Sequence, residues 1–398
     1  MRILFLTPLF PYPPVSGGLI KTWTILTYLS QQGHQVEALC FRKGALSPAQ
    51  EAFASDFPGS VEALPLNRQR TPSNLLRSYV SGLPLSVYRN QSPQMQALVG
   101  RRLARQSYDL VFVDHWLMAQ YVPADFRGPS VLHQHNAEHV LWRREAQATR
   151  TPWGRAILAL EYGRVRRYEA SILSRFRWLL AVSEPDRQAL TALGAPPERV
   201  QVLPNVADPR LLSQPPLRFD DLPPNVLYLG TLSWLPNSQG LASFLRDAHP
   251  LLQHSLPETR LIIAGSGPPA WLRRAVRRRP GLELINPAEE PEPLYSRARA
   301  FLETVRGGGG TKVKVLNALA RGLPVAATPE GAEGIDAVPG QHLLVADDPP
   351  SMVAAIEALL ADKVIWQRLS DNGRALVRER YQPHTAYRAL DRILAEGT

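Results

Sequence analysis

Short, continuous apolar runs alternate along this chain with stretches in which apolar residues recur at helical spacing. Residues 3–7 and 36–41 are apolar runs of strand length, and the helical pattern of residues 20–32 lies between them and ends at Gly33. Continuous apolar runs are typical of strands that a parallel sheet buries on both faces. A strand, a helix and a second strand of this size form a βαβ unit, so the pattern predicts an α/β fold.

The same alternation continues to the end of the chain in two similar halves. Further strands are predicted at residues 61–64, 109–114, 130–135, 178–183 and 200–203 in the first half, and at 226–230, 261–265, 282–285, 300–305, 325–328 and 343–346 in the second. Long helical patterns cover residues 153–175, 350–361, 365–381 and 384–396. Between the halves, residues 209–224 are polar and rich in proline, which is typical of a linker between domains.

The most distinctive stretch is residues 306–324, which read RGGGGTKVKVLNALARGLP. Its four consecutive glycines allow positive φ angles and leave the backbone bare, and a short helical pattern closed by Gly322 follows at once. Lys312 and Lys314 stand in the first turn of this helix, where the N–H groups and the helix dipole also favour an anion. We interpret the stretch as a phosphate site; the alternative is a glycine-rich surface turn before a solvated helix.

The composition supports the phosphate interpretation. Arginine supplies most of the basic charge, and two of the five lysines in the chain fall within this one turn. The stretch is not a Walker P-loop, because the GxxxxGK[ST] spacing is absent and no Ser or Thr follows a lysine to hold magnesium.

The net charge of +10 indicates an anionic partner but does not identify its class. A basic chain suits a nucleic acid, an anionic membrane surface or anionic small molecules. The denser arginine groups lie at residues 143–144, 164–167 and 273–279, but no nucleic-acid motif or interleaved aromatic pattern accompanies them. We therefore expect no nucleic acid and favour peripheral contact with an anionic membrane over it, while a solvated helix face remains the default interpretation of each arginine group.

Cysteine usage and hydropathy exclude other classes of protein. A single cysteine, Cys40, excludes a disulfide framework and a cysteine zinc site. The apolar N-terminus is too short for a signal peptide and is broken by Pro8 and Pro11, and no apolar run reaches the 18 residues of a membrane span. The GxSxG motif of a serine hydrolase is also absent.

Polar residues follow several predicted strands, at the edge where open α/β sheets bind ligands. Gly17 and Gly18 come after the first strand, although the GxGxxG fingerprint of dinucleotide sites is missing. Asp114 and His115 end a later strand, and His135 ends the next one within the run HQHNAEH. We interpret His135 as a hydrogen-bond donor or charge stabiliser beside a bound sugar; the alternative is a histidine satisfied by a neighbouring carbonyl.

We expect no metal at this run. His133, His135 and His139 share it, but their spacing matches no zinc motif, and a strand-end loop need not bring them together. In the second half, Gly265 and Gly267 form a tight turn after a strand, which favours close approach of the backbone to a ligand.

Motifs spread over most of the chain resemble those of retaining GT-B glycosyltransferases of family 4. They are MRILFLTPLFPYPPVSGG, HQHNAE, AVSEPD, VLPNVAD, YLGTLSWLPNSQGLASF, LIIAGSGPP and GGGGTKVKVLNALARGLPVAATPEGAEGI. The last motif is the most specific, since it resembles the GGGT-x-x-K-x-x-E-A-x-A-x-G-x-P block of a subgroup linked to envelope and exopolysaccharide assembly. The other motifs are individually weak and jointly strong.

The resemblance implies an α/β GT-B fold in which two Rossmann-like domains face a cleft. It implies an acceptor domain over residues 1–207, a linker over 208–224, and a domain for a nucleotide-diphosphate sugar over 225–378. It also implies that a terminal helix, within residues 379–398, packs back on the first domain. Enzymes of this kind need no bound metal or cofactor, because basic side chains and a helix N-terminus neutralise the diphosphate.

Site roles carried over from the family fall on residues of both halves. The catalytic residues are expected to be His135, Lys312 and Lys314. The groups around the donor diphosphate are expected to be Gly17, Gly18, Gly308, Gly309, Gly310, Thr311 and Lys312. Those around the donor nucleoside and sugar are expected to be Gly230, Gly265, Gly267, Asn317 and Glu333, and those on the acceptor side His115 and Glu138.

Two departures from the family pattern fall in the donor site. Gly309 and Asn317 stand where many members carry glutamates, and the subgroup usually lacks only the first of these. An amide at position 317 binds ribose hydroxyls with weaker, uncharged hydrogen bonds. The Arg and Lys pair often found after the first strand of the second domain is replaced by a loop with Ser233, Trp234 and Asn237.

The resemblance therefore implies a retaining, metal-independent transferase that moves a sugar from a nucleotide-diphosphate sugar to a hydroxyl acceptor. The acceptor is expected to be a lipid-linked sugar, a polysaccharide or a small glycoside. The enzyme is expected in the cytoplasm, with peripheral contact to the inner face of the cell membrane. Two alternatives on the same fold stay open: a sugar-nucleotide epimerase and a non-catalytic nucleotide-sugar-binding relative. A further alternative is a basic membrane-surface scaffold that binds no nucleotide.

Overall fold

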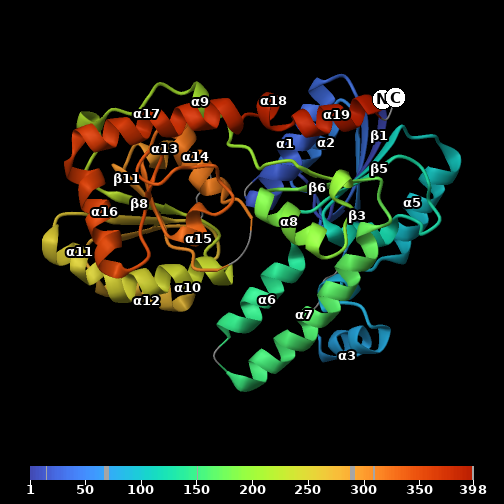
Figure 1. Cartoon of the computed structure of the whole chain (residues 1–398), viewed down its shortest axis with the longest axis horizontal. Coiled ribbons are helices and arrows are strands. Elements are labelled where there is room, and N and C mark those ends of the chain that lie inside the picture. The colour runs from blue at the N-terminus through green and yellow to red at the C-terminus, as the bar shows by residue number, and fades with distance from the viewer. Residues whose placement is uncertain (15, 67–70, 150, 287–291, 308–309, 397–398) are drawn as a thin grey trace. The chain divides into compact units, whose positions relative to one another are not determined.

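In the computed structural model, which describes residues 1–14, 16–66, 71–149, 151–286, 292–307 and 310–396, the chain forms two compact units. Unit 1 comprises Met1–Pro204 and Tyr387–Thr398, and unit 2 comprises Asn205–Ala386. Each unit is built on a parallel sheet with helices packed against it (Figure 1). The prediction of two Rossmann-like, parallel-sheet domains is confirmed.

Within the described residues, the sheet of unit 1 has seven parallel strands in the order β3-β2-β1-β4-β5-β6-β7. The strands are β1 (Arg2–Leu6), β2 (Gln35–Arg42), β3 (Ser60–Pro65), β4 (Leu110–Asp114), β5 (Ser130–His133), β6 (Trp178–Ala181) and β7 (Val200–Val202). Every residue of β4 and β5 is buried, as their apolar runs predict. Phe5 of β1 stacks on Phe112 of β4, with ring centroids 4.9 Å apart.

Helices connect and cover these strands. The helices of unit 1 are α1 (Gly17–Gln31), α2 (Pro48–Asp56), α3 (Pro72–Ser81), α4 (Leu85–Tyr88), α5 (Pro93–Arg105), α6 (Glu138–Ala148), α7 (Pro152–Leu173), α8 (Glu184–Ala192) and α19 (Arg388–Glu396), with short 3₁₀ turns η1 (Trp116–Tyr121) and η2 (Pro197–Arg199). None of the helices that the structure describes has both the length and the apolar content needed to cross a bilayer.

The part of unit 2 that the structure describes contains a six-stranded parallel sheet in the order β10-β9-β8-β11-β12-β13. The strands are β8 (Val226–Leu229), β9 (Leu261–Ala264), β10 (Leu282–Ile285), β11 (Ala300–Glu303), β12 (Val325–Ala327) and β13 (Leu344–Val345). The helices are α9 (Pro209–Ser213), η3 (Phe219–Asp221), α10 (Leu235–Ser243), η4 (Phe244–Ala248), α11 (His249–Ser255), α12 (Ala270–Arg278), α13 (Glu292–Tyr295), α14 (Val313–Arg321), α15 (Pro329–Ala332), α16 (Pro349–Ala361), α17 (Lys363–Arg380) and α18 (Pro383–Ala386).

Both sheets reverse their strand order at the same point. β1 lies between β2 and β4 in unit 1, and β8 lies between β9 and β11 in unit 2. In open α/β sheets, ligands bind outside the carboxyl ends of the strands at such a switch point. The residues that follow β1 and β4, and those that follow β8 and β11, are therefore the first places to search for a site.

The prediction of a linker over residues 208–224 is wrong. This stretch belongs to unit 2, where Leu211, Leu217 and Leu222 are buried in the apolar core. Its prolines obscured this spacing in the sequence, because Pro209 starts the short helix α9 rather than a connection between domains. The chain returns to unit 1 at Tyr387 rather than at 379, since α17 continues to Arg380 within unit 2.

The last helix, α19, is part of unit 1. Tyr387, just before it, packs edge-on against Tyr28 of α1 with ring centroids 5.1 Å apart. The Tyr28 hydroxyl donates to Oδ1 of Asp391 at 2.6 Å, and burial together with this carboxylate raises the pKa of Tyr28. At the other end of the helix, Trp178 Nε1 of β6 donates to Glu396 at 3.2 Å. These contacts tie the end of the chain to the sheet that its beginning forms.

The ring of Tyr387 should account for most of this attachment. The side chain is 1% exposed, so Tyr387→Ala should lower the free energy of unfolding by about 3–5 kcal/mol. Its buried hydroxyl has no hydrogen-bond partner among the described residues, so Tyr387→Phe should keep stability or raise it by about 1 kcal/mol. Urea unfolding followed by circular dichroism measures both. Equal losses in the two variants would show that the hydroxyl, not the ring, holds α19.

Candidate active site

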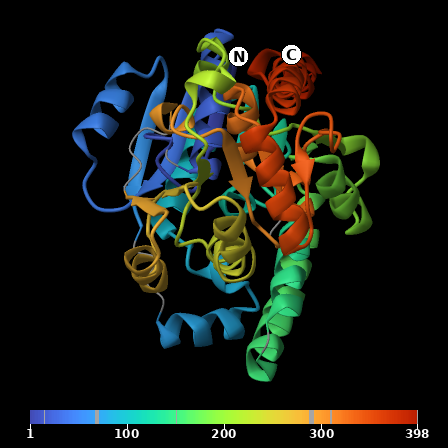
Figure 2. The same cartoon turned by 90° about the vertical axis from the view of Figure 1, so that its left-hand side faces the viewer.

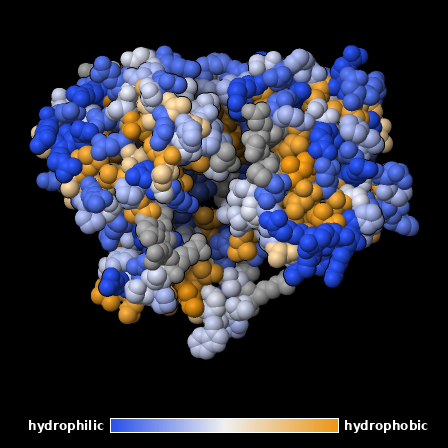
Figure 3. Space-filling view, turned by 180° about the vertical axis from the view of Figure 1, so that it is seen from behind, coloured by the Kyte–Doolittle hydropathy of each residue, from blue (hydrophilic) through white to orange (hydrophobic). Residues whose placement is uncertain are grey.

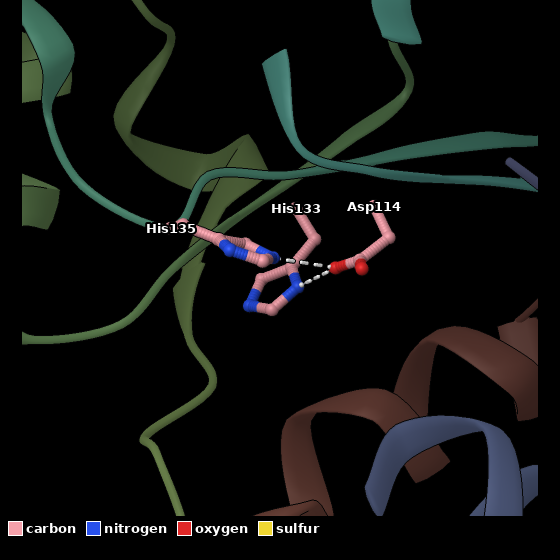
Figure 4. Close-up of side chains that lie close together, drawn as sticks. All are labelled: Asp114, His133 and His135. Carbon is pink, nitrogen blue, oxygen red and sulfur yellow. Dashed lines mark hydrogen bonds and ion pairs between the residues drawn. The ribbon is translucent and has the colours of Figure 1, made fainter. Parts of the chain in front are cut away.

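Asp114, the last residue of β4, is the centre of the candidate site in unit 1. Its buried Oδ1 accepts hydrogen bonds from two histidines, His133 Nδ1 at 2.8 Å and His135 Nε2 at 2.7 Å (Figure 4). Its Oδ2 accepts from the hydroxyls of Thr22 at 2.5 Å and Thr7 at 3.3 Å. These residues come from the carboxyl ends of β1, β4 and β5 and from α1, so they meet at the switch point of the sheet.

These contacts fix the protons on both imidazoles. Burial alone would raise the pKa of Asp114, but the two histidines hold that pKa well below its usual range, so Asp114 is ionised. Burial lowers the pKa of His133 to about 4 and also lowers the pKa of His135, so both rings are neutral at pH 7. A neutral imidazole has one N–H, and each ring turns it to Asp114. His135 therefore keeps Nδ1 as an acceptor, and a Cβ added to Gly18 would lie 3.9 Å from it.

His115 adds an unusual backbone conformation next to Asp114. Its φ of 96° is the only positive φ of a non-glycine residue within the described ranges. Such a conformation costs energy that the surrounding structure must supply, and it is found most often at functional sites. His115 Nδ1 accepts from the N–H of Leu117 at 3.3 Å, and the ring meets His135 edge-on with centroids 4.9 Å apart. The sharp turn thus places His115, expected on the acceptor side, against His135.

Glu138, also expected on the acceptor side, lies in an acidic group at the start of α6. Glu169 of α7 is fully buried and accepts from the N–H groups of Glu138 and His139, both at 2.9 Å, and from His139 Nδ1 at 2.7 Å. Asp186 of α8 accepts from the N–H of Ala137 at 2.9 Å. Carboxylates of the chain itself thus occupy this helix N-terminus. Burial and the charge of Glu169 raise the pKa of Glu138 to about 8.

Lys21 of α1 is the buried cation of this region. Its side chain is 6% exposed, and burial lowers its pKa to about 8 against the attraction of Asp114, Asp186 and Glu138. Carboxylates therefore outnumber the ammonium group. A mixture of many acceptors and few donors suits the hydroxyl groups of a sugar better than it suits a second anion.

Two of the three histidines of the HQHNAEH run converge. The ligand atoms of Asp114, His133 and His135 lie within 4.8 Å of one another, whereas His139 bonds to Glu169. Both histidine nitrogens stand only 2.7–2.8 Å from the same carboxylate oxygen. The ligands of a tetrahedral zinc stand about 3.3 Å apart, given bond lengths of about 2.0–2.1 Å. The three side chains therefore have the spacing of a hydrogen-bonded group rather than of a zinc site.

Lys314, in the first turn of α14, is the centre of the corresponding group in unit 2. Its ammonium forms an ion pair with Glu303 Oε2 at 2.9 Å and donates to Asn237 Oδ1 at 2.9 Å. It also lies over the ring of Tyr228, 4.6 Å from the centroid. Burial works against this charge, but Glu303 and Tyr228 outweigh it and raise the pKa of Lys314. Because Glu303 ends β11, the pair stands at the switch point of the second sheet.

Lys312 is the N-cap residue of α14 and is buried, whereas Lys314 is half-buried. Its ammonium donates to the carbonyl of Gly310 at 2.7 Å, so the side chain folds back onto the glycine turn. The neighbouring Thr311 is fixed on both sides: its hydroxyl donates to the carbonyl of Gly334 at 3.0 Å, and its carbonyl accepts from Asn205 Nδ2 at 3.1 Å. The turn before α14 is therefore anchored to two other segments of unit 2.

The other residues expected at the diphosphate belong to different parts of the chain. Gly17 and Gly18 start α1 in unit 1, where Gly18 lies near His135. Gly308 and Gly309 lie outside the described residues. The role of all four at a diphosphate stays a prediction.

Three glycines expected at the donor nucleoside and sugar come together after β8 and β9. Gly265 and Gly267 have φ of +150° and +67°, and a Cβ on Gly265 would lie 1.8 Å from the carbonyl oxygen of Gly230. A Cβ on Gly267 would lie 2.8 Å from Cβ of Ser233, and one on Gly230 would lie 3.3 Å from Lys314 Nζ. Packing of the two loops already requires glycine at these positions, and it leaves bare backbone beside Lys314.

Asn317 and Glu333, expected at the same part of the donor, occupy separate positions in unit 2. Asn317 is buried on α14, and its Oδ1 accepts from the backbone N–H of Asp208 at 2.9 Å. This contact ties α14 to the start of α9. Glu333 is half-buried at the end of α15, and the next residue, Gly334, is the one that Thr311 contacts.

Sequence reasoning missed several members of these groups, among them Lys21, Thr22, Tyr228 and Glu303. Glu303 falls within the predicted strand 300–305, and a charged residue near the end of a buried strand points to the ligand-binding edge. Lys21 is one of five lysines in the chain and follows Gly18 by three residues. Its rarity and its place on the first helix were signals that could have found it.

Comparisons with known proteins agree with this architecture. A relative from Klebsiella pneumoniae, described as an uncharacterized 44.6 kDa protein in the cps region, is 24% identical over 98% of each chain. Sucrose-phosphate synthase from Thermosynechococcus elongatus is similar in structure, with a TM-score of 0.72 at 16% identity over 100% of this chain and 98% of that one. HepE from Anabaena, solved in complex with UDP-glucose, gives a TM-score of 0.68 at 15% identity over 100% of both chains. The two structural likenesses establish the fold.

Two family models match the chain itself. Residues 17–211 match the model described as Glycosyltransferase Family 4, and residues 223–362 match the one described as Glycosyl transferases group 1. The first covers most of unit 1 and the second most of unit 2. The chain is therefore a glycosyltransferase of the GT-B type.

Proposed function

We propose that this glycosyltransferase is retaining and metal-independent, and that it moves a sugar from a nucleotide-diphosphate sugar to a hydroxyl acceptor. The observation that carries the proposal is the pair of lysines at the start of α14, of which Lys312 is buried and Lys314 is half-buried. Both ammonium groups stand at the positive end of the helix dipole, and Lys314 is paired with Glu303. Two lysines and a helix N-terminus are groups that favour a diphosphate without a metal ion.

In the proposed reaction, the acceptor oxygen bonds to the anomeric carbon as the bond from that carbon to the diphosphate breaks. The acceptor proton leaves with the diphosphate. The transition state is oxocarbenium-like, and negative charge grows on the leaving group. Lys312, which is already fixed against the turn before α14, would stabilise that charge together with the first N–H groups of the helix. One such preorganised donor is typically worth about 3–4 kcal/mol.

Lys314 has a related but distinct part in this proposal. Glu303, Asn237 and Tyr228 hold its ammonium in one place and keep it charged. It points at the bare backbone of Gly230, which is where a donor could approach closely. A cation that is oriented before the substrate arrives needs no reorganisation during the reaction.

His135 would act on a sugar hydroxyl in unit 1. Asp114 fixes the ring and takes its only N–H, so Nδ1 is available to accept a hydrogen bond. The same arrangement of a carboxylate behind a neutral imidazole orients histidines in other enzymes. The part of His135 is therefore that of an oriented acceptor, whereas the sequence suggested a donor or charge stabiliser.

The donor, the acceptor and the cellular location of this activity are proposed from the relatives. HepE was solved with UDP-glucose, which supports a nucleotide sugar as donor. The relative in the cps region, together with the motif of the envelope and exopolysaccharide subgroup, supports a role in polysaccharide biosynthesis of the cell envelope. The acceptor would then be a lipid-linked sugar, a polysaccharide or a small glycoside, met in the cytoplasm at the inner face of the membrane.

A non-catalytic nucleotide-sugar-binding protein is the second candidate. Asn317 stands in place of a family glutamate, and its amide oxygen already bonds to Asp208. Glu303 neutralises part of the charge that a diphosphate would use. Both features reduce the number of charged groups that remain for the donor. A protein with such a site would bind the donor without transferring its sugar.

One experiment tests the proposal against both alternatives. Nucleotide diphosphates and nucleotide sugars should raise the melting temperature in the presence of EDTA, because a ligand that binds only the folded state stabilises it. The nucleotide that gives the shift should then be released as free diphosphate when hydroxyl acceptors are added. Isomerisation of the sugar without diphosphate release would indicate an epimerase. Binding without turnover over a broad acceptor panel would indicate the non-catalytic relative.

Loss of either lysine should impair turnover. Lys312→Ala and Lys314→Ala should each lower kcat by about 10²–10³, because each removes a preorganised cation from the leaving group. The rate of sugar transfer from a labelled donor measures the effect. Full activity in both variants would exclude the phosphate site.

Stability measurements separate the two lysines. Lys314→Met leaves Glu303 buried without its cation, which should cost about 3–5 kcal/mol of unfolding free energy. The double variant Glu303→Gln/Lys314→Met removes both charges and should recover most of that loss while kcat stays low. If the double variant regains both stability and turnover, Lys314 serves the fold and not the chemistry.

The variant His135→Gln should separate the two functions proposed for this side chain, its hydrogen bond to Asp114 and its acceptance of a hydrogen bond at Nδ1. Glutamine can still donate to Asp114 but offers no acceptor at the place of Nδ1, so kcat should fall about 10²-fold while donor KM stays nearly constant. The pKa of His135 is lowered, so the wild-type rate should hold down to about pH 6.5, the ordinary imidazole value, and fall below it as the ring is protonated. The variant should lack this acid limb. A change in donor KM alone would assign His135 to binding.

A further inference from the structure

Exposed apolar side chains are concentrated on two helices of unit 1. Of the twelve large hydrophobic side chains that are exposed among the described residues, seven lie on α3 and α7. They are Leu75, Leu76, Tyr79 and Val80 of α3, and Trp153, Ile157 and Leu160 of α7. We call these seven side chains the hairpin surface, because α7 forms an antiparallel hairpin with α6. Val80 and Trp153 are each 84% exposed.

The residues of α7 in this surface form one stripe along the helix. Trp153, Ile157, Leu160 and Arg164 follow one another at spacings of four, three and four residues, so they share a helix face. The guanidinium of Arg164 lies over the ring of Tyr79, 4.3 Å from the centroid. The apolar stripe of α7 therefore runs directly into the exposed face of α3.

A buried ion pair holds the two helices together. Arg164 Nη1 bonds to Glu161 at 2.6 Å, and Nη2 donates to the carbonyls of Ser78 and Leu83 at the end of α3. Glu161 in turn accepts from the N–H of Leu85 at 2.6 Å. Arg164 belongs to the arginine group 164–167, for which the sequence predicts a solvated helix face, but its side chain is buried. The hairpin surface is thus fixed by interactions behind it.

The exposed charged side chains that the structure describes on α3, α6 and α7 are all positive. Arg77, Arg143, Arg155, Arg166 and Arg167 are exposed on α3, α6 and α7. Three of the four glutamates of α6 and α7 are buried, and the fourth is half-buried. Arginine keeps its charge in any surroundings and can rest its apolar stem on an apolar surface. A basic border around apolar and aromatic side chains is the pattern of a helix that lies in the interface of an anionic bilayer.

A hollow beside the hairpin lies on another face of α7. It has a volume of about 370 Å³ and is lined by Arg143, Ala146, Gln147, Arg155, Ala159 and Tyr162. Arg155 follows Trp153 by two residues, about 200° around the helix, so the arginines of the hollow belong to the polar face that an interfacial helix keeps among the lipid phosphates.

The hairpin projects from the rest of unit 1. Figure 1 shows α6 and α7 side by side, extending away from the sheet, and Figure 2 shows α3 at the same end of the unit as this hairpin. The space-filling view in Figure 3 shows hydrophobic residues at the lower left, in the part of unit 1 where α3 lies. The apolar side chains are therefore accessible to a flat partner.

We propose that the hairpin surface docks unit 1 on an anionic lipid bilayer, with Trp153, Ile157, Leu160 and the α3 side chains at the headgroup level and the arginines on lipid phosphates. This proposal rests on the hairpin surface alone and does not depend on the donor chemistry proposed for unit 2. A second copy of the chain is a poorer occupant, because two basic borders would repel each other. An acidic protein partner fits the charge but not the extent of uncharged apolar surface.

Sedimentation with vesicles tests the docking. The chain should bind phosphatidylcholine vesicles that contain phosphatidylglycerol and should bind pure phosphatidylcholine vesicles weakly. Trp153→Ser/Ile157→Ser and Arg143→Gln/Arg155→Gln should each weaken binding about tenfold or more. Leu251→Ser/Val364→Ser, which removes two exposed hydrophobic side chains of unit 2, is the matched control and should bind as the wild type does.

A second measurement covers the case in which a variant folds poorly. Cys40 is the only cysteine and is fully buried, so Trp153→Cys offers one accessible thiol for a polarity-sensitive dye. Anionic vesicles should shift the emission of this dye to the blue, and a dye at Val364→Cys should not respond. Unchanged emission at position 153, equal vesicle binding by all variants, or a wild-type dimer that Trp153→Ser/Ile157→Ser abolishes would each overturn the proposal.

Discussion

The architecture of both candidate sites depends on one requirement, the neutralisation of a buried carboxylate at the end of a central strand. Asp114 ends β4 and Glu303 ends β11, and both are fully buried next to a switch point. A buried carboxylate costs several kcal/mol unless charges or hydrogen bonds compensate it. Asp114 draws in the two histidines of the next strand, and Glu303 draws in Lys314 from α14. The groups able to do chemistry are therefore gathered where the sheet needs them for its own stability.

This requirement explains what the sequence could predict. The strands were found because each is a short apolar run buried on both faces, and a local pattern is enough to recognise it. The pairing of Asp114 with His135, or of Glu303 with Lys314, joins different strands and helices, and no local pattern records it. The error over residues 208–224 has the same origin: Leu211, Leu217 and Leu222 belong to the core of unit 2, but the prolines between them are also typical of linkers.

Glycine after a strand can be required for two different reasons, close approach of a ligand or close packing of two loops. In the sequence, Gly265 and Gly267 indicated close approach of the backbone to a ligand. The structure shows that the loops after β8 and β9 already touch, since a Cβ on Gly265 would overlap the carbonyl of Gly230. Glycine at these positions is thus required without any ligand. The stronger sign of a donor site is the ammonium of Lys314, which faces this bare backbone and is kept charged at some cost in solvation.

The two basic residue types are used in different places, and the difference follows from their chemistry. Three of the five lysines lie in the candidate sites, where Lys21 and Lys312 are buried and Lys314 is half-buried, whereas exposed arginines lie on the helices of the hairpin surface. Lysine is a compact charge whose pKa responds to its surroundings: burial lowers the pKa of Lys21 to about 8, and Glu303 helps to raise that of Lys314. Arginine stays charged beside apolar groups. The basic charge behind the net value of +10 is therefore used in two ways, as lysines in the candidate sites and as arginines on the helices of the hairpin surface.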